Sequence, residues 1–329
     1  MIQKIASVEI SGLFAYLCMR VKLRFTGGRG FALNAEEGEN DWLINLDLND
    51  LEQKYLFADC VREPENLIVY RALSASKLAT NFVDIGANCG HVALSILNSY
   101  ENILLFEPNP TLANLLRIIF QDSTHVKIKE CAIVDHESVG TLVLSVPTDS
   151  SGLATLGGTL LSAQRPDINV YSVNALTLES QIDDMFLSKA YIKIDVEGFE
   201  ENIIRSIHRV IVNQRPIVGF EALSLSLALN CSSYFKDYSF YCSRFDFLED
   251  GGALSNSKMG IIFALLSGAN IEILKLDKLE AVGLRNFSQI YAVPNEKSEL
   301  FERSVSDYVG DHPVIELDNL RTWSARPVL

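Results

Sequence analysis

Short apolar runs alternate with amphipathic stretches from residue 81 onward, which is the pattern of parallel strands joined by helices. The predicted strands are Asn81–Ile85, Asn102–Phe106, Val126–Ala132, Ala190–Val196 and Pro216–Glu221, with two more at Ser239–Ser243 and Gln289–Val293. The predicted helices are His91–Ser99, Thr111–Phe120, Leu178–Met185 and Glu200–Asn213. Right-handed crossovers between such elements predict an α/β fold with one doubly wound, mostly parallel sheet.

This pattern covers residues 78–295, and the segment before it is different. Residues 1–77 are predicted to be an N-terminal α+β extension made of a helix and a hairpin. The helix is an apolar-rich stretch from Ile5 to Met19. The hairpin turns at Gly27-Gly28-Arg29-Gly30, between Lys22–Thr26 and Phe31–Asn34. A second helix, Asn66–Ala79, is expected to lead into the central region.

Two other segments fall outside the regular alternation. Residues 296–329 are polar and are predicted to be a C-terminal tail, with either a short added strand or a disordered end. Residues Ser138–Val173 are too long for a plain connection and contain several Gly, Ser and Thr residues. Loops of this length in compact domains are usually lids or disordered. We therefore predict a mobile loop here.

Composition and charge exclude some partners. The 329 residues include 28 basic and 42 acidic side chains, a formal net charge of −14, which argues against a nucleic-acid partner. The six cysteines form no C-x-x-C pair, which fits a reducing, cytoplasmic location. The mean hydropathy of +0.15 is high for a soluble monomer. It predicts a homo-oligomer, or membrane-peripheral contact through the basic, apolar-rich residues 5–29.

The strongest chemical signal is the sequence Val83-Asp84-Ile85-Gly86-Ala87-Asn88-Cys89-Gly90. A strand ends at Asp84, the glycines at 86 and 90 allow a tight turn around Asn88, and a helix begins near Gly90. Such a turn brings a ligand close to the backbone. The second strand ends at Glu107, where a carboxylate can accept hydrogen bonds from both hydroxyls of a ribose. These features fit a dinucleotide or S-adenosylmethionine.

Two details favour S-adenosylmethionine. The turn reads G-x-N-x-G and lacks the third glycine that permits close approach of a pyrophosphate. The acidic Asp84 inside the turn suits a cationic cofactor better than a phosphate. A nicotinamide-dependent oxidoreductase is the alternative, but the chain lacks a Tyr-x-x-x-Lys signature. A non-catalytic scaffold is the third hypothesis, and the intact Asp84, Glu107 and Asp195 argue against it.

Charged residues at the end of the fourth strand mark the predicted reaction site. Lys193, Asp195 and Glu197 alternate with apolar residues, which puts the three on one face while the strand runs straight. Glu221 ends the next strand. Because ligands of open α/β sheets bind at the carboxyl ends of the strands, one of these carboxylates can act as general base toward a hydroxyl. Carboxylates also suit Mg²⁺, but without a spacing motif no metal is predicted.

Four motifs together carry a family resemblance: VDIGANCG at 83–90, FEPNP at 106–110, YIKIDVEGFE at 191–200 and RPIVGFE at 215–221. In this order they resemble the FkbM-type methyltransferases. One departure is Leu178-Glu179, where the family often has Leu-Asp. The resemblance implies a class I, Rossmann-like fold that binds S-adenosylmethionine.

Individual site residues follow from the same resemblance. Asp84, Gly86, Asn88 and Gly90 match the cofactor loop, and Glu107 matches the ribose ligand. Ala132 falls where the family lines the adenine. The family usually methylates a hydroxyl. The expected activity is O-methylation of a sugar, glycan or polyketide-like natural product, with Asp195, Glu197, Lys193 and Glu221 as the catalytic candidates.

Overall fold

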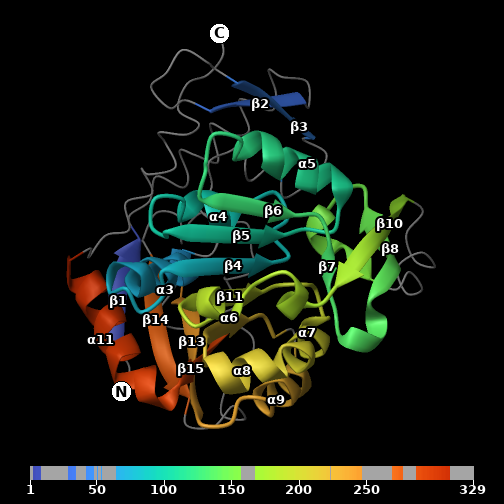
Figure 1. The fold of residues 1–329 in the computed structure, drawn as a ribbon. Helices are drawn as coiled ribbons and strands as arrows, with labels where there is room; N and C mark the ends of the chain where they lie inside the picture. The colour runs from blue at the N-terminus through green and yellow to red at the C-terminus, as the bar shows by residue number, and fades with distance from the viewer. Residues whose placement is uncertain are drawn as a thin grey trace.

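The computed structural model describes residues 3–8, 29–34, 42–47, 50, 53, 64–156, 167–222, 224–246, 269–276 and 287–311. Its centre is a nine-stranded sheet with helices on both faces (Figure 1). Five strands pair in parallel, in the spatial order β6 (Val126–Lys129), β5 (Asn102–Phe106), β4 (Asn81–Ile85), β11 (Ala190–Ile194) and β12 (Ile217–Phe220).

The sheet continues beyond β12 with four strands in antiparallel pairs. In order they are β15 (Phe287–Pro294), β13 (Tyr238–Asp246), β14 (Ala269–Leu276) and β1 (Gln3–Val8). Because each pairing reverses direction, β14 and β15 are the two strands that run against the rest. The predicted mostly parallel sheet is confirmed, and two of the nine strands are reversed.

Two hydrophobic cores flank the sheet, since successive residues of a strand point to opposite faces. Phe82 and Tyr191 pack into one core, and their neighbours Val83 and Ile192 pack into the other. The helices on the first face are α3 (Pro64–Ala75), α4 (His91–Ser95), α5 (Pro110–Ile119) and α11 (Asn295–Asp311). Those on the second are α6 (Asp184–Leu187), α7 (Glu200–Ser206), α8 (His208–Gln214) and α9 (Leu225–Ser232). The predicted doubly wound arrangement is confirmed.

The predicted mobile loop at Ser138–Val173 is wrong where the structure describes it. This segment supplies most of a second sheet, beside the first (Figure 1), with the order β7 (Ala132–Ile133), β10 (Ile168–Leu176), β8 (Gly140–Pro147) and β9 (Thr155–Leu156). Leu144, Val146 and Val173 form its small core. Apolar and polar residues alternate along β8 and β10, which is the pattern of a strand. The Gly- and Ser-rich composition of the segment obscured this pattern.

Both flanking segments also differ from the prediction. Residues 3–8 form the strand β1 at the sheet edge, where a helix was predicted from Ile5. The predicted hairpin strand is β2 (Arg29–Asn34), but it pairs with β3 (Trp42–Asp47). The C-terminal segment begins with the long helix α11, whose Phe301 and Val305 are buried against the first core. Residues 9–28 and 312–329 lie outside the described residues.

Three predicted helices are shorter or divided. The helix α4 ends at Ser95. The stretch predicted as Leu178–Met185 is a 3-10 turn, η3 (Leu178–Ser180), followed by α6, which Asp183 caps through the N–H of Phe186. Two further 3-10 turns are η1 (His136–Ser138) and η2 (Ser151–Leu153). The predicted helix Glu200–Asn213 is split into α7 and α8 at Ile207. The strand predicted to run to Ala132 divides into β6 and β7.

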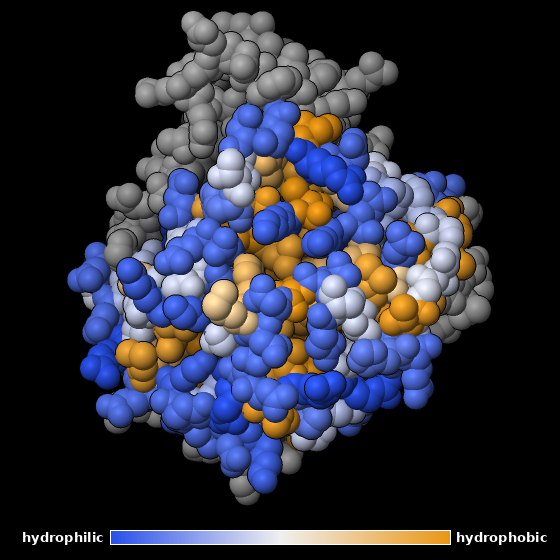
Figure 2. Space-filling view, viewed as in Figure 1, coloured by the Kyte–Doolittle hydropathy of each residue, from blue (hydrophilic) through white to orange (hydrophobic). Residues whose placement is uncertain are grey.

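The described surface is mostly hydrophilic in the view of Figure 2, with hydrophobic residues in an interrupted band through the middle. The large exposed hydrophobic side chains belong to different elements, among them Val143, Val170 and Met185. None of the described helices combines the length and the apolar content that a membrane span needs. Homo-oligomerisation and membrane-peripheral contact through residues 5–29 stay predictions.

Candidate active site

The turn after β4 holds three residues in left-handed backbone, with φ angles of 91° at Gly86, 50° at Asn88 and 83° at Gly90. The N–H groups of Gly86 and Ala87 both donate to the carbonyl oxygen of Phe106, at 3.0 Å each. The turn is therefore fixed to the carboxyl end of β5. Positive φ angles are the physical reason for the two glycines.

Each glycine also faces a close neighbour. A Cβ atom on Gly86 would lie 2.0 Å from the backbone oxygen of Asp195. A Cβ atom on Gly90 would lie 2.6 Å from the Leu116 side chain and 3.1 Å from that of Phe120. Gly90 thus lets the start of α4 approach α5. Gly86 lets the turn approach the loop after β11, so it positions this acidic loop as well as the turn itself.

We expect Gly86→Val to lower the free energy of unfolding by about 2–5 kcal/mol, because overpacking against a backbone atom adds to the strain of a positive φ. Urea unfolding measures this effect. Gly310→Ala is the control, since a Cβ atom there meets nothing within 4 Å. A Gly86→Val protein as stable as the wild type would contradict the close approach of the two loops.

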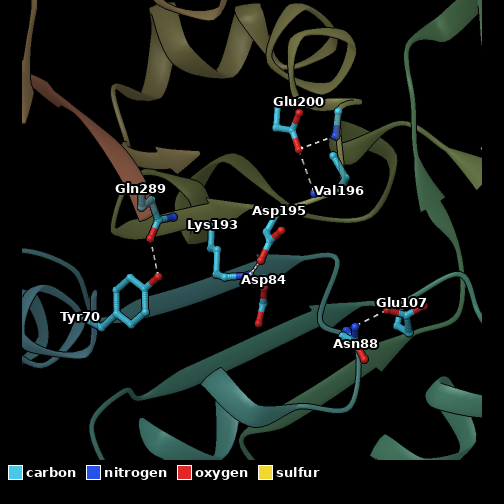
Figure 3. Close-up of polar contacts among 10 residues, drawn as sticks. Tyr70, Asp84, Asn88, Glu107, Lys193, Asp195, Val196, Glu200 and Gln289 are labelled. Atoms are coloured by element: carbon cyan, nitrogen blue, oxygen red, sulfur yellow. Dashed lines mark hydrogen bonds and ion pairs between the residues drawn. The ribbon is translucent and has the colours of Figure 1, made fainter. Parts of the chain in front are cut away.

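Glu107 is a buried carboxylate directly after β5, only 6% exposed. Its Oε2 accepts a hydrogen bond from the Asn88 N–H at 2.8 Å (Figure 3). Its Oε1 accepts one from the Asn109 N–H, also at 2.8 Å. Burial raises the pKa of Glu107 to about 7, although both N–H donors act to lower it. A carboxylate has about four acceptor positions, so two remain for other donors.

A cavity opens in front of Glu107. It is lined by the predicted cofactor residues Gly86, Asn88, Glu107 and Ala132 and by the apolar side chains of Ile133, Leu144 and Leu156. The second sheet supplies these three apolar side chains. One buried carboxylate beside an apolar wall fits a nucleoside. The carboxylate can accept hydrogen bonds from two ribose hydroxyls, and the apolar wall can pack against a flat base.

Lys193 lies at the centre of the site on β11, and its side chain is 5% exposed. In the parallel pairing of β11 and β4, Lys193 is directly opposite Asp84. Its Nζ lies 3.2 Å from Asp84 Oδ1 and 3.0 Å from Asp195 Oδ2 (Figure 3). A buried ammonium is costly unless a carboxylate pairs with it. Two carboxylates, Asp84 and Asp195, pair with the buried ammonium of Lys193.

Three carboxylates gather beside this ion pair. Asp195, Glu197 and Glu221 each place one oxygen within 4.8 Å of the others. The predicted straight strand through Glu197 is wrong, because β11 ends at Ile194 and Glu197 has a φ of 52°. The cluster nevertheless forms, since β11 and β12 end at the same sheet edge. Such a set can hold a proton or a divalent cation. The absence of a catalytic metal stays a prediction.

Sequence reasoning missed Glu200, the first residue of α7. This carboxylate is fully buried, and its Oε1 accepts the N–H groups of Val196 at 3.2 Å and of Gly198 at 3.0 Å (Figure 3). Burial raises the pKa of the Glu200 carboxyl above its usual range. Glu200 shapes the loop that carries Asp195 and Glu197. The signal in the sequence is an acidic residue at a helix start, just after the Glu-Gly turn.

A second cavity adjoins the first. Lys193, Asp195, Glu197 and Glu221 line it together with Asn88, His91 and residues 150, 152 and 153 of the second sheet region. Gly86, Asn88, Asp195 and Glu197 line both cavities, so these are two parts of one cleft. Of the predicted cofactor residues, Glu107 and Ala132 line the first part alone, and of the predicted catalytic residues, Lys193 and Glu221 line the second alone. Asp84 and Gly90 do not line the described cavities. Asp84 pairs with Lys193 instead, and Gly90 ends the turn that leads into α4.

Residues 84–245 match the model of the methyltransferase FkbM domain. The chain carries an FkbM methyltransferase domain. Every site residue named from the sequence, from Asp84 to Glu221, lies within the matched range. The spatial order of β6, β5, β4, β11 and β12 and the reversed β15 beside them give the domain a class I, Rossmann-like methyltransferase fold. No curated protein matches the chain.

Solved structures similar to this chain include other methyltransferases. One is the methyltransferase FkbM from Methylobacillus flagellatus KT, with a TM-score of 0.37 and 16% identity; the alignment covers 65% of this chain and 44% of that protein. Another is precorrin-6y C5,15-methyltransferase from Geobacter metallireducens GS-15, with a TM-score of 0.32, 14% identity and coverage of 68% and 86%. The tRNA (m1A58) methyltransferase from Aquifex aeolicus has a TM-score of 0.30, 10% identity and coverage of 70% and 69%.

Proposed function

We propose that this protein is an S-adenosylmethionine-dependent O-methyltransferase whose acceptor is a hydroxyl of a sugar, glycan or polyketide-like natural product. The observation that carries the proposal is the placement of Glu107. This buried carboxylate ends the second strand of an FkbM domain, is held by the N–H of Asn88, and faces a cavity with an apolar wall. Binding of a dinucleotide is disfavoured, because the turn after β4 lacks the third glycine of the dinucleotide-binding sequence G-x-G-x-x-G.

The residues of the first cavity hold the cofactor in this proposal. Glu107 accepts hydrogen bonds from the two ribose hydroxyls, and Ala132, Ile133 and Leu156 pack against the adenine. When bound, S-adenosylmethionine supplies a methyl group on a positively charged sulfur. The acidic residues of the neighbouring cavity suit that positive charge.

The residues of the second cavity act on the acceptor. Asp195 accepts the proton that the acceptor hydroxyl loses, since within the cluster of three carboxylates it is the one that Lys193 holds in place, at 3.0 Å. Glu197 and Glu221 accept hydrogen bonds from neighbouring hydroxyls of the acceptor. A hydroxyl-rich acceptor such as a sugar suits three closely spaced carboxylates. Most of the rate acceleration then comes from alignment of the acceptor, because the methyl group is already activated.

Thermal melting with added nucleotides tests the cofactor. S-adenosylhomocysteine and S-adenosylmethionine are expected to raise the melting temperature, because a ligand that binds only the native state stabilises it. NAD is the control for the oxidoreductase alternative and is expected to have no effect. Stabilisation by NAD alone would overturn the proposal, and stabilisation by neither would favour a non-catalytic scaffold.

Methyl transfer itself tests the acceptor class. The protein is incubated with S-adenosylmethionine carrying a labelled methyl group and with pools of saccharides, glycans and polyketide-like alcohols. Label in an alkali-stable methyl ether is the expected result. Label confined to the amino groups of amino sugars in these pools would contradict O-methylation while leaving the methyltransferase assignment in place.

A further inference from the structure

Asp50 joins the N-terminal extension to the wall of the cofactor cavity. This carboxylate is only 4% exposed. A buried carboxylate needs hydrogen-bond partners to offset the cost of desolvation, and Asp50 has three. Its Oδ2 accepts the N–H of Ser151 at 2.5 Å. Its Oδ1 accepts the Ser151 hydroxyl at 3.1 Å and the Gln53 N–H at 2.9 Å. Two of its three partners are therefore groups of one residue, 101 positions away in the sequence.

Ser151 passes this contact on to the cofactor turn. Its hydroxyl lies 3.2 Å from Asn88 Oδ1 as well as 3.1 Å from Asp50 Oδ1, so its one proton is shared between two acceptors. The backbone N–H of Asn88 in turn donates to Glu107 at 2.8 Å. Asp50, Ser151, Asn88 and Glu107 thus form one continuous series of hydrogen bonds, from the N-terminal extension to the carboxylate that faces the cavity.

Three of these four hydrogen-bonded residues line the first cavity. Ser151, Asn88 and Glu107 all line the first cavity, and residues 150 and 152 beside Ser151 line the second. Asp50 does not line either described cavity. It holds Ser151 from behind, so its influence on a bound molecule must pass through the wall and the turn.

We propose that Asp50 is a positioning residue that latches the Ser151 wall onto the cofactor turn and thereby sets how long the cofactor stays bound. The latch consists of Asp50, Ser151 and Asn88. This inference rests on the proposed function, since it takes S-adenosylmethionine or its product as the molecule in the first cavity. When the latch is broken, the Ser151 wall is no longer held to the turn, and the Asn88 side chain loses its contact with the Ser151 hydroxyl. The backbone N–H of the same Asn88 orients Glu107.

The test is the dissociation rate of S-adenosylhomocysteine, measured by stopped-flow fluorescence or surface plasmon resonance. Loss of the charge-assisted hydrogen bonds of Asp50 in the Asp50→Ala variant is expected to raise this rate about tenfold without slowing association. Ser151→Ala removes the hydroxyl that joins Asp50 to Asn88 but keeps the backbone N–H that donates to Asp50, and it is expected to raise the dissociation rate as well. The double variant should match the single ones, because the residues act as one unit. Asp50→Asn, which keeps an acceptor, should lie closer to the wild type.

Asp167→Ala is the matched control, because Asp167 is an exposed acidic residue just before β10, and it is expected to leave the rates unchanged. Wild-type dissociation rates in folded Asp50→Ala and Ser151→Ala proteins would overturn the latch. So would additive effects in the double variant, or loss of folding in both single variants, which would show a purely structural contact. A wild-type protein that does not bind S-adenosylhomocysteine would instead overturn the proposed function.

Discussion

Asp195→Asn is expected to lower the single-turnover rate of methyl transfer by about 10²–10⁴-fold, because it removes the proton acceptor for the substrate hydroxyl. The fold and the affinity for S-adenosylhomocysteine should change little. A large loss of stability would be expected if Asp195 were the only counter-ion of the buried Lys193. The structure lowers that expectation, because Lys193 keeps Asp84 at 3.2 Å when Asp195 is neutral.

The stability cost of Asp195→Asn follows from exposure. The Asp195 side chain is 34% exposed, so solvent screens its pairing with Lys193. Ion pairs that solvent can reach typically contribute about 0–1 kcal/mol. Removing Lys193 would be different, because it would leave the buried Asp84 without this cation.

Single-turnover kinetics and thermal melting, measured on the same preparations, check this prediction. Glu197→Gln and Glu221→Gln are the matched variants, and the proposal expects smaller rate losses from them than from Asp195→Asn. Asp122→Asn, an exposed acidic residue after α5, is the control. An Asp195→Asn protein that melts much earlier but transfers methyl groups at the wild-type rate would assign Asp195 a structural role.

Glu107→Gln is expected to make stability less dependent on pH. The pKa of Glu107 is about 7 in the folded protein against an ordinary value of 4.5, so folding favours its protonated form. The protonated carboxyl therefore contributes stability that is fully present below pH 4.5 and is lost as the pH rises through 7. Between these limits the wild type should lose about 3 kcal/mol of unfolding free energy relative to the variant, which cannot ionise.

Urea unfolding of both proteins at pH 4.5, 6 and 8 measures this difference. The change in the difference between pH values is the quantity of interest, because the amide also loses one N–H partner at every pH. Glu101→Gln, at an exposed position just before β5, is the control and should follow the wild type. A constant difference across the pH range would contradict the raised pKa of Glu107.

The site could be predicted largely because its signals are local. The turn at Gly86–Gly90 and the strand end at Glu107 each depend on a few consecutive residues. Asp195, Glu197 and Glu221 could be grouped because parallel strands end at one edge of a sheet. The predicted straight strand failed at Glu197, where the left-handed backbone depends on the buried Glu200.

The parts of the fold that were missed depend on long-range pairing. β1 finds its partner in β14, where Gln3 lies opposite Ile273, and no local pattern indicates such a pairing. An apolar-rich stretch at the start of the chain therefore looked like a helix. The helix α11 was missed because few of its residues, among them Phe301 and Val305, are apolar and buried. The contact of Asp50 with Ser151 has no signal in the sequence.

The pH dependence of S-adenosylhomocysteine binding, measured by calorimetric titration, tests the central claim most directly. If the ribose hydroxyls bind the ionised Glu107, the dissociation constant of the wild type should be constant near pH 8 and rise about tenfold per pH unit below 7. Glu107→Gln should bind at least about tenfold more weakly at pH 8, and its affinity should not vary with pH. Equal affinities of the two proteins across the pH range, or binding of NAD in place of S-adenosylhomocysteine, would contradict the assignment of this cleft.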